Sequence, residues 1–210
     1  MIGVLGGTFD PIHFGHLRPA LEVFQSIGLT ELRFVPLNVA VHRRQPRATG
    51  AQRAEMVRVA VQGQTGFRVD ENELARPGGS YSYDTLASLR EGLGAREPVC
   101  LLLGSDAFRH FLTWHRPDAI LSLAHLVVMR RPGSHELIDP QLQRWSEPRL
   151  CTDPGELSLV AGGRILYQNV TQMDISATVV RDLLSRGLSP RYLVPDAVLE
   201  IIQRDSLYRP

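Results

Sequence analysis

The sequence contains no lysine, and all 23 of its basic residues are arginine. This absence excludes a Walker A phosphate loop, which needs Gly-Lys-Ser/Thr, and it excludes any Schiff-base lysine. A bias in genome composition is the simplest explanation for so much arginine. Any phosphate that the protein binds must nevertheless be held without lysine.

Cysteine and net charge are scarce as well. Two cysteines, Cys100 and Cys151, are too few for a disulfide framework and fit a reducing cytoplasm. The formal net charge of +1 argues against a nucleic-acid-binding or membrane-surface protein. No apolar run approaches the roughly 18 residues of a transmembrane helix, and the N-terminus resembles a strand rather than a signal peptide. We therefore expect a cytoplasmic protein that binds neither nucleic acid nor membranes; the oligomeric state is left open.

Short apolar runs alternate with amphipathic segments along the chain. We expect strands at residues 2–5, 32–37, 67–69, 99–103, 126–129 and 165–167, and helices at 17–27, 51–62, 84–93, 107–114 and 137–145. This alternation predicts an α/β fold, doubly wound around a mostly parallel sheet, in a single domain over residues 1–210. From about residue 175 we expect a small helical subdomain, in which a helix at 195–204 packs on a helix that starts after Ser176.

The most specific feature is the run Gly6-Gly7-Thr8-Phe9-Asp10-Pro11-Ile12-His13-Phe14-Gly15-His16, between the first strand and the first helix. Glycines let backbone N–H groups approach an anion, and a helix N-terminus adds partial positive charge. The two histidines add donors that can carry a full charge. Paired histidines also suit zinc, but the sequence offers neither H-E-x-x-H nor a cysteine cluster to complete a zinc site. The run therefore indicates anion binding, while Asp10-Pro11 is interpreted as a turn.

Two other segments carry candidate ligand-binding groups. Gly104-Ser105-Asp106 ends a buried strand, where ligands of doubly wound sheets bind. Asp106 could hydrogen-bond a ribose hydroxyl, lie near a metal, or merely cap the next helix. Thr178 and Arg181 share one helix face and could hold a phosphate together, although an ordinary capped surface helix explains them equally well.

A flat or carboxylate-bearing ligand has two candidate contacts. Trp114 could stack on an aromatic ring, with core packing as the plainer alternative. The segment around Tyr81, Ser82 and Tyr83 opens a helix after two glycines, so its backbone N–H groups could receive a small carboxylate.

Together these residues resemble the bacterial nicotinate-nucleotide adenylyltransferase family of the nucleotidyltransferase α/β phosphodiesterase superfamily. The match to Gly-Gly-Thr-Phe-Asp-Pro-Ile-His-x-Gly-His is complete, and the late motif Ile-Ser-x-Thr-x-x-Arg matches Ile175, Ser176, Thr178 and Arg181. Further family-like segments lie at residues 53–56, 80–86, 104–106, 131–133 and 192–208. One departure is at residues 40–43, which are Ala-Val-His-Arg where the family commonly has Pro-Pro-His-Lys.

The resemblance implies a Rossmann-like nucleotidyltransferase fold and a reaction of NAD biosynthesis. In that reaction the adenylyl group of ATP passes to nicotinate mononucleotide, giving nicotinate adenine dinucleotide and pyrophosphate, with Mg²⁺ held through the ATP phosphates. Catalytic roles fall to His13, His16 and Arg181. Contacts to ATP fall to Gly6, Gly7, Thr8, Phe9, His13, His16, Arg43, Gly104, Asp106, Ser176, Thr178 and Arg181. Contacts to nicotinate mononucleotide fall to Tyr81, Ser82, Tyr83, Asp106 and Trp114.

Other functions are compatible with parts of this pattern. A sister enzyme for nicotinamide mononucleotide or phosphopantetheine would share the histidine loop. A non-catalytic nucleotide-binding regulator would be expected to lose a phosphate-binding group, yet both histidines, Thr178 and Arg181 are present. A dehydrogenase is disfavoured because the G-x-G-x-x-G fingerprint is missing.

Overall fold

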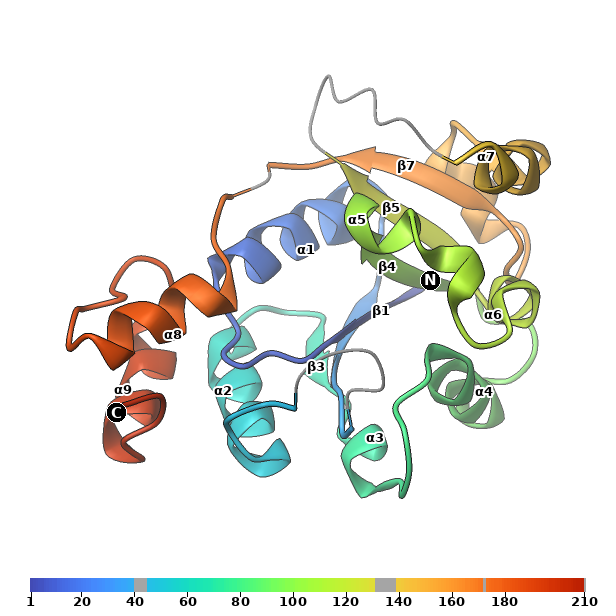
Figure 1. Ribbon diagram of the computed structural model, residues 1–210. Helices are drawn as coiled ribbons and strands as arrows, with labels where there is room; N and C mark the ends of the chain where they lie inside the picture. Colours follow the sequence, from blue (N-terminus) through green and yellow to red (C-terminus); the bar gives the residue numbers. More distant parts are fainter. Residues whose placement is uncertain (40–44, 131–138, 172, 210) are drawn as a thin grey trace. The chain divides into compact units, whose positions relative to one another are not determined.

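The computed structural model describes residues 1–39, 45–130, 139–171 and 173–209 (Figure 1). Strands alternate with helices over most of this chain, and short 3₁₀ helices are labelled η. In chain order the elements are β1 (Ile2–Gly7), α1 (Phe14–Ser26), β2 (Glu31–Pro36), α2 (Gly50–Val61), β3 (Phe67–Val69), α3 (Asn72–Ala75), α4 (Ser82–Leu93), β4 (Val99–Gly104), α5 (Ser105–Phe108), η1 (Phe111–Thr113), α6 (Pro117–Leu123), β5 (His125–Arg130), α7 (Pro140–Ser146), η2 (Glu147–Arg149), β6 (Leu150–Cys151), η3 (Pro154–Ser158), β7 (Ile165–Asn169), α8 (Ala177–Ser185) and α9 (Asp196–Arg204).

The strands form one seven-stranded sheet in the order β3-β2-β1-β4-β5-β7-β6. Strand β1 runs parallel to β4, β4 to β5, β5 to β7, and β7 to β6. The predicted doubly wound parallel fold is therefore confirmed. The strand order reverses between β1 and β4, which is the switch point of such sheets. Each of these two strands leads directly into a predicted site segment.

The chain divides into two compact units. Unit 1 comprises Met1–Leu5, Ala20–Leu32 and Tyr81–Thr171, and unit 2 comprises Gly6–Pro19, Arg33–Ser80 and Gln172–Pro210. That the whole chain works as one domain stays a prediction.

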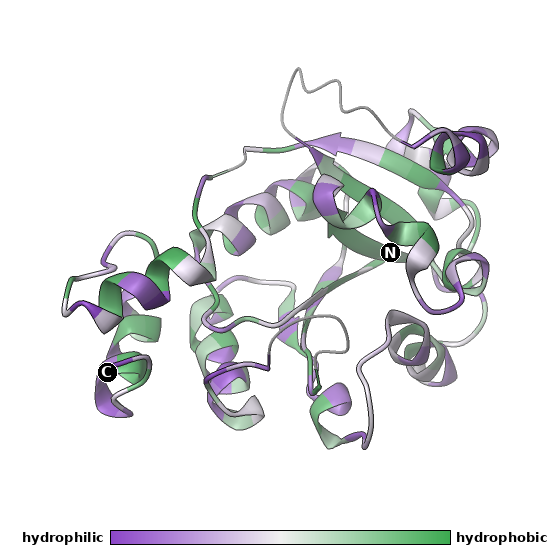
Figure 2. Cartoon of the chain, viewed as in Figure 1, coloured by the Kyte–Doolittle hydropathy of each residue, from purple (hydrophilic) through white to green (hydrophobic). Residues whose placement is uncertain are grey.

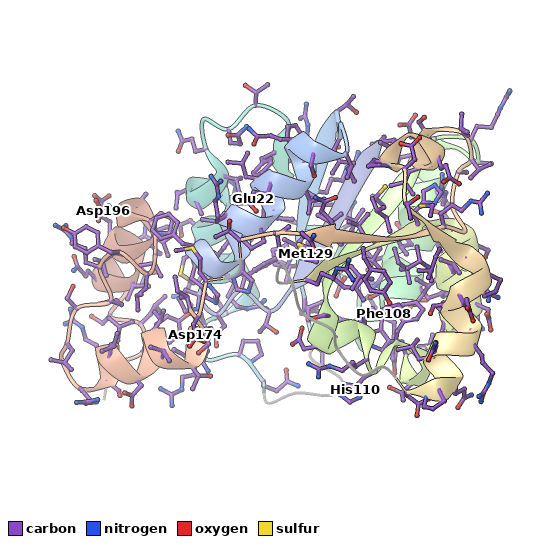
Figure 3. All side chains as sticks on the ribbon, turned by 90° about the horizontal axis from the view of Figure 1, so that it is seen from above. Glu22, Phe108, His110, Met129, Asp174 and Asp196 are labelled. Atoms are coloured by element: carbon purple, nitrogen blue, oxygen red, sulfur yellow. The ribbon has the colours of Figure 1, made fainter. Side chains whose placement is uncertain are left out.

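The centre of unit 1 is built from β4 and β5. All of Val99–Leu103 and of His125–Met129 is buried, and Figure 2 shows these strands as the most hydrophobic stretch of the unit. Helix α5 lies against both strands, and α4 packs on α6. Figure 3 places Phe108 among the side chains that cover the sheet, whereas His110, only two residues later, lies at the edge of the unit.

Unit 2 contains the C-terminal helices. Val198, Leu199, Ile201 and Ile202 of α9 are buried, as the apolar pattern predicts. Their main helical neighbour is α2, which the apolar pattern does not indicate, and the expected packing of α9 on α8 stays a prediction. Polar groups reinforce this contact: Arg204 of α9 forms two hydrogen bonds with Glu55 of α2, at 2.8 and 2.9 Å.

The other helix predictions need two corrections. The segment 107–114 is not one helix, because α5 ends at Phe108 and a separate 3₁₀ turn covers 111–113. The predicted helix at 137–145 corresponds to α7, which starts at Pro140 after the N-cap Asp139. The remaining predicted helices and strands agree with the structure within a few residues at their ends.

Candidate active site

The first half of the histidine loop is shaped by the Phe9 ring. Phe9 is 1% exposed and has a left-handed backbone (φ 48°), which folds its ring back beneath the chain. A Cβ atom at Gly7 would lie 2.7 Å from that ring. Gly7 is therefore required by the packing of Phe9, whatever it contributes to an anion. Because its ring is buried, Phe9 can offer only backbone atoms to ATP.

The two histidines of the loop form a stacked pair. The rings of His13 and His16 have their centroids 3.8 Å apart at an interplanar angle of 29°, and the Phe9 ring meets His16 edge-on at 5.2 Å. His13 is 4% exposed, and this burial lowers its pKa from 6.5 to about 4. The sequence indicates donors that can carry a charge. At neutral pH, burial keeps the His13 ring neutral.

His13 has an unused polar atom, unlike His125, which is also deeply buried. His125 is fully buried, but its Nε2 donates to the Val160 carbonyl at 2.9 Å and its Nδ1 accepts from the Arg164 N–H at 3.1 Å. Within the described part of the chain, His13 Nδ1 has no hydrogen-bond partner. Buried polar groups in native proteins are normally satisfied, so this exception calls for an explanation, and a functional role is one.

Gly15 allows the histidine loop and the start of α8 to approach closely. A Cβ atom at residue 15 would lie 2.9 Å from His13 Nδ1 and 3.0 Å from the Ile175 carbonyl oxygen. Any side chain there would have to displace one of them. In contrast, the first N–H of α1 already has a partner, because Phe14 donates to the Leu193 carbonyl at 3.0 Å. The sequence suggests that this N–H could bind an anion, but its hydrogen bond to Leu193 makes it unavailable.

Helix α8 presents the predicted phosphate-binding pair on one face. Ser176 is its N-cap and accepts from the Val179 N–H, as expected. Arg181 Nη2 donates to Thr178 Oγ1 at 3.2 Å, and Arg181 Nη1 donates to the Asp10 carbonyl at 2.6 Å. The late motif and the histidine loop, far apart in sequence, are thus joined in unit 2.

Asp10 organises this group, a role beyond the simple turn expected of it. Its peptide bond to Pro11 is cis, and the residue is 5% exposed. The carboxylate accepts from the N–H groups of Arg47 (2.9 Å) and Ala48 (3.1 Å) and from the Tyr208 hydroxyl (2.7 Å). These donors lie before α2 and at the end of the chain, so one side chain holds three segments.

A second supporting residue is Arg53 of α2, which is 1% exposed. Its guanidinium donates to the carbonyls of Thr8 (2.7 Å), Leu37 (2.6 Å) and Ala48 (3.3 Å). Burial lowers the pKa of Arg53, while the Asp10 charge raises it. In sequence Arg53 is only part of a family-like segment, because no local pattern distinguishes a buried arginine from an exposed one.

In unit 1, Asp106 and Trp114 are placed by the turn that follows β4. Gly104 is the N-cap of α5, so the alternative that Asp106 caps this helix is wrong. Asp106 is exposed, and its carboxylate lies over Gly104, where an added Cβ would meet Oδ1 at 2.6 Å. Trp114 follows η1 and is half-buried, with its ring against Phe111 at 5.3 Å.

The predicted carboxylate-binding segment belongs to an aromatic and cationic cluster. Tyr81 is the N-cap of α4 and makes no side-chain cap, and its ring lies 4.8 Å from His115. The Arg116 guanidinium lies 4.7 Å above the Tyr83 ring. Sequence reasoning missed His115 and Arg116. The available signal was the run Trp-His-Arg, which places two cationic side chains directly after the candidate stacking residue.

Some predictions cannot be placed. Arg43, with the rest of the divergent stretch 40–43, and the family-like segment 131–133 lie outside the described residues. Within the described ranges, no group of three or more His, Cys, Asp and Glu side chains could hold a metal ion. In that same part of the chain, no helix is long and apolar enough to cross a membrane.

Comparisons with known proteins agree with this arrangement. The family model described as "Cytidylyltransferase-like" matches residues 4–183. A Methylococcus capsulatus protein named "Probable nicotinate-nucleotide adenylyltransferase" is 46% identical over 99% of both chains. An Escherichia coli protein of the same name is 40% identical over 98% of this chain and 97% of its own. The fold matches Plasmodium falciparum nicotinic acid mononucleotide adenylyltransferase complexed with NaAD, with a TM-score of 0.73, 16% identity, and coverage of 99% of this chain and 96% of that one. The chain belongs to the nicotinate-nucleotide adenylyltransferase family of cytidylyltransferase-like proteins.

Proposed function

We propose that this protein transfers the adenylyl group of ATP to nicotinate mononucleotide, releasing pyrophosphate and forming nicotinate adenine dinucleotide for NAD biosynthesis. The observation that carries the proposal is the grouping of His13, His16, Thr178 and Arg181 in one compact unit, joined through the hydrogen bond from Arg181 to Asp10. The names of the relatives, at 40–46% identity over nearly the whole chain, support the same reaction.

The chemistry requires little from the protein beyond charge and alignment. An oxygen of the acceptor phosphate attacks the α-phosphorus of ATP, and the bond from that phosphorus to the bridging oxygen breaks as pyrophosphate leaves. The acceptor phosphate is largely dianionic at pH 7, with a second pKa of about 6, so no general base is needed. Catalysis then depends on orienting the two phosphates and stabilising the charge that builds up on them.

In this proposal the phosphates of ATP bind at the residues of unit 2. His13 and His16 donate N–H groups to the α-phosphate and to the charge that develops there, and Thr178 and Arg181 hold the departing phosphates. His13 starts as a neutral donor because its burial lowers its pKa. A bound phosphate raises that pKa again, since an adjacent negative charge favours the protonated ring. Backbone atoms of Gly6 to Phe9, together with Ser176, complete the nucleotide contacts.

We further propose that the divalent cation is Mg²⁺ and that it is held by ATP. The described residues supply no ligand cluster of their own, whereas phosphate oxygens are the hard ligands that Mg²⁺ prefers. When bound, the cation offsets part of the charge on the leaving pyrophosphate. Arg181 does the same from the protein side.

For the acceptor we propose the residues of unit 1. Trp114 stacks on the pyridine ring, and the backbone N–H groups at the start of α4 receive the carboxylate. Arg116, placed against Tyr83, adds positive charge to this segment. That charge favours nicotinate, which carries a carboxylate, over nicotinamide, which is neutral. Asp106 and Gly104 contact a nucleotide ribose.

We place the reaction in the cytoplasm and take the chain to act as one domain. Both cysteines are free and buried, which suits a reducing compartment.

The test is an acceptor panel. The protein is incubated with ATP and Mg²⁺ plus nicotinate mononucleotide, nicotinamide mononucleotide or phosphopantetheine, and pyrophosphate release is followed. We expect the highest kcat/KM with nicotinate mononucleotide. Faster turnover of either other acceptor would assign the protein to a sister activity. ATP binding without pyrophosphate release from any acceptor would support a regulator instead.

A further inference from the structure

We propose that Tyr208, which follows α9, is a positioning residue of the ATP phosphate site and acts by keeping Arg181 available to the nucleotide. This proposal rests on the proposed function only in taking Arg181 as a phosphate ligand. All the contacts that carry it lie within unit 2.

The first step is that neutral donors satisfy the Asp10 carboxylate. Oδ1 accepts from the Tyr208 hydroxyl at 2.7 Å and from the Ala48 N–H at 3.1 Å, while Oδ2 accepts from the Arg47 N–H at 2.9 Å. Tyr208 is 6% exposed, and burial beside Asp10 raises the pKa of its hydroxyl, so it remains a neutral donor.

The second step is that Arg181 is held next to this carboxylate without a hydrogen bond to it. Arg181 Nη1 donates to the backbone carbonyl of Asp10 at 2.6 Å, and the same nitrogen is 3.8 Å from carboxylate Oδ2. Its Nη2 points to Thr178 at 3.2 Å, and the side chain is 23% exposed. The guanidinium is therefore oriented by the histidine loop, yet its charge is not consumed in a close ion pair.

The third step follows from removing the hydroxyl. Without Tyr208 the buried carboxylate loses its shortest hydrogen bond, and an under-satisfied buried charge is costly. Arg181 is a cation already within 4 Å of it. Closing that gap would form a tight ion pair and draw the guanidinium away from Thr178. Tyr208 prevents this exchange, so the end of the chain sets the orientation of a phosphate ligand in α8.

The experiment measures ATP affinity by calorimetry, which does not depend on turnover. Tyr208→Phe keeps the buried ring and removes only the donor, and we expect ATP to bind about tenfold more weakly, the scale of one lost hydrogen bond to a charged group. Tyr192→Phe is the matched control from the same C-terminal segment, because Tyr192 is 82% exposed and we expect no change. Introducing 4-aminophenylalanine at residue 208 restores an N–H donor and should restore affinity.

A double-mutant cycle distinguishes positioning from a structural role. In an Arg181→Ala protein, Tyr208→Phe should cause no further loss of ATP affinity, since its effect passes through Arg181. An equal tenfold loss in that background, an unchanged affinity in the single variant, or a Tyr208→Phe protein that no longer unfolds cooperatively would each overturn the proposal. A wild-type protein that binds ATP but turns over no acceptor would refute the proposed reaction and leave this cycle interpretable.

Discussion

Acid destabilises a protein that keeps its histidines neutral, and His13 allows a quantitative test. Burial lowers the pKa of His13 from 6.5 to about 4, so between these values the unfolded chain binds a proton that the folded chain does not. The contribution of His13 to stability is therefore fully present above pH 6.5 and is lost as the pH falls toward 4. At about 1.4 kcal/mol per pH unit inside this window, the loss amounts to about 2 kcal/mol at pH 5.

The assay is urea denaturation of the wild type and of His13→Gln at pH 7 and pH 5. Losses from other groups, including His125, whose pKa is also lowered by burial, occur in both proteins and cancel in the difference. We expect the free energy of unfolding of the wild type to fall by about 2 kcal/mol more than that of the variant between the two pH values. Equal pH dependence of the two proteins would refute a neutral, buried His13.

Three further predictions concern the packing of the site. Gly15→Ala should lower kcat by about a hundredfold, because the added methyl would displace His13. The control Gly92→Ala, which adds a methyl in open space on α4, should leave kcat unchanged. Equal kcat in both variants would contradict the close approach of Gly15 to His13. Arg53→Lys should lower the free energy of unfolding, measured by urea denaturation, by about 2 kcal/mol, because one ammonium group cannot donate to the same three carbonyls in the geometry of the guanidinium. A urea midpoint equal to that of the wild type would contradict this. Trp114→Ala should raise KM for nicotinate mononucleotide about tenfold, and more than it raises KM for ATP. The control Trp145→Ala removes the other indole that packs on Phe111 and should not raise KM for nicotinate mononucleotide in this way. Equal effects of the two substitutions would argue that Trp114 serves core packing alone.

Most of the fold was predictable because burial and periodicity are local signals. Val99–Leu103 is apolar throughout, which predicts a strand covered on both faces, and β4 has that environment. The two-residue strand β6 is too short to form a pattern. Within residues 107–114, the buried Phe108 and Phe111 have the three-residue spacing of a helix face. The helix nevertheless ends at Phe108, because the chain turns at His110 before the 3₁₀ turn begins.

The partners of the site residues could not be predicted in the same way. The motifs themselves indicate His13, His16 and Arg181 as candidates, but the residues that hold these three in place come from distant parts of the chain. Tyr208 lies 198 residues from Asp10, and Arg53 lies 45 residues from Thr8. Helical and strand periodicities relate residues within one element only, so contacts at such separations are visible only in the folded structure.

The position of Asp10 explains how a buried carboxylate can lie inside the proposed phosphate site. An unpaired negative charge there would repel ATP, but both oxygens face donors of the protein and only 5% of the residue is exposed. Arg53 and Arg181 lie close enough to offset its charge. His13 contributes no charge at neutral pH, because burial lowers its pKa to about 4. Positive charge in the proposed phosphate site thus comes from the Arg181 guanidinium, which the backbone carbonyl of Asp10 orients, while the Asp10 carboxylate holds the neighbouring segments.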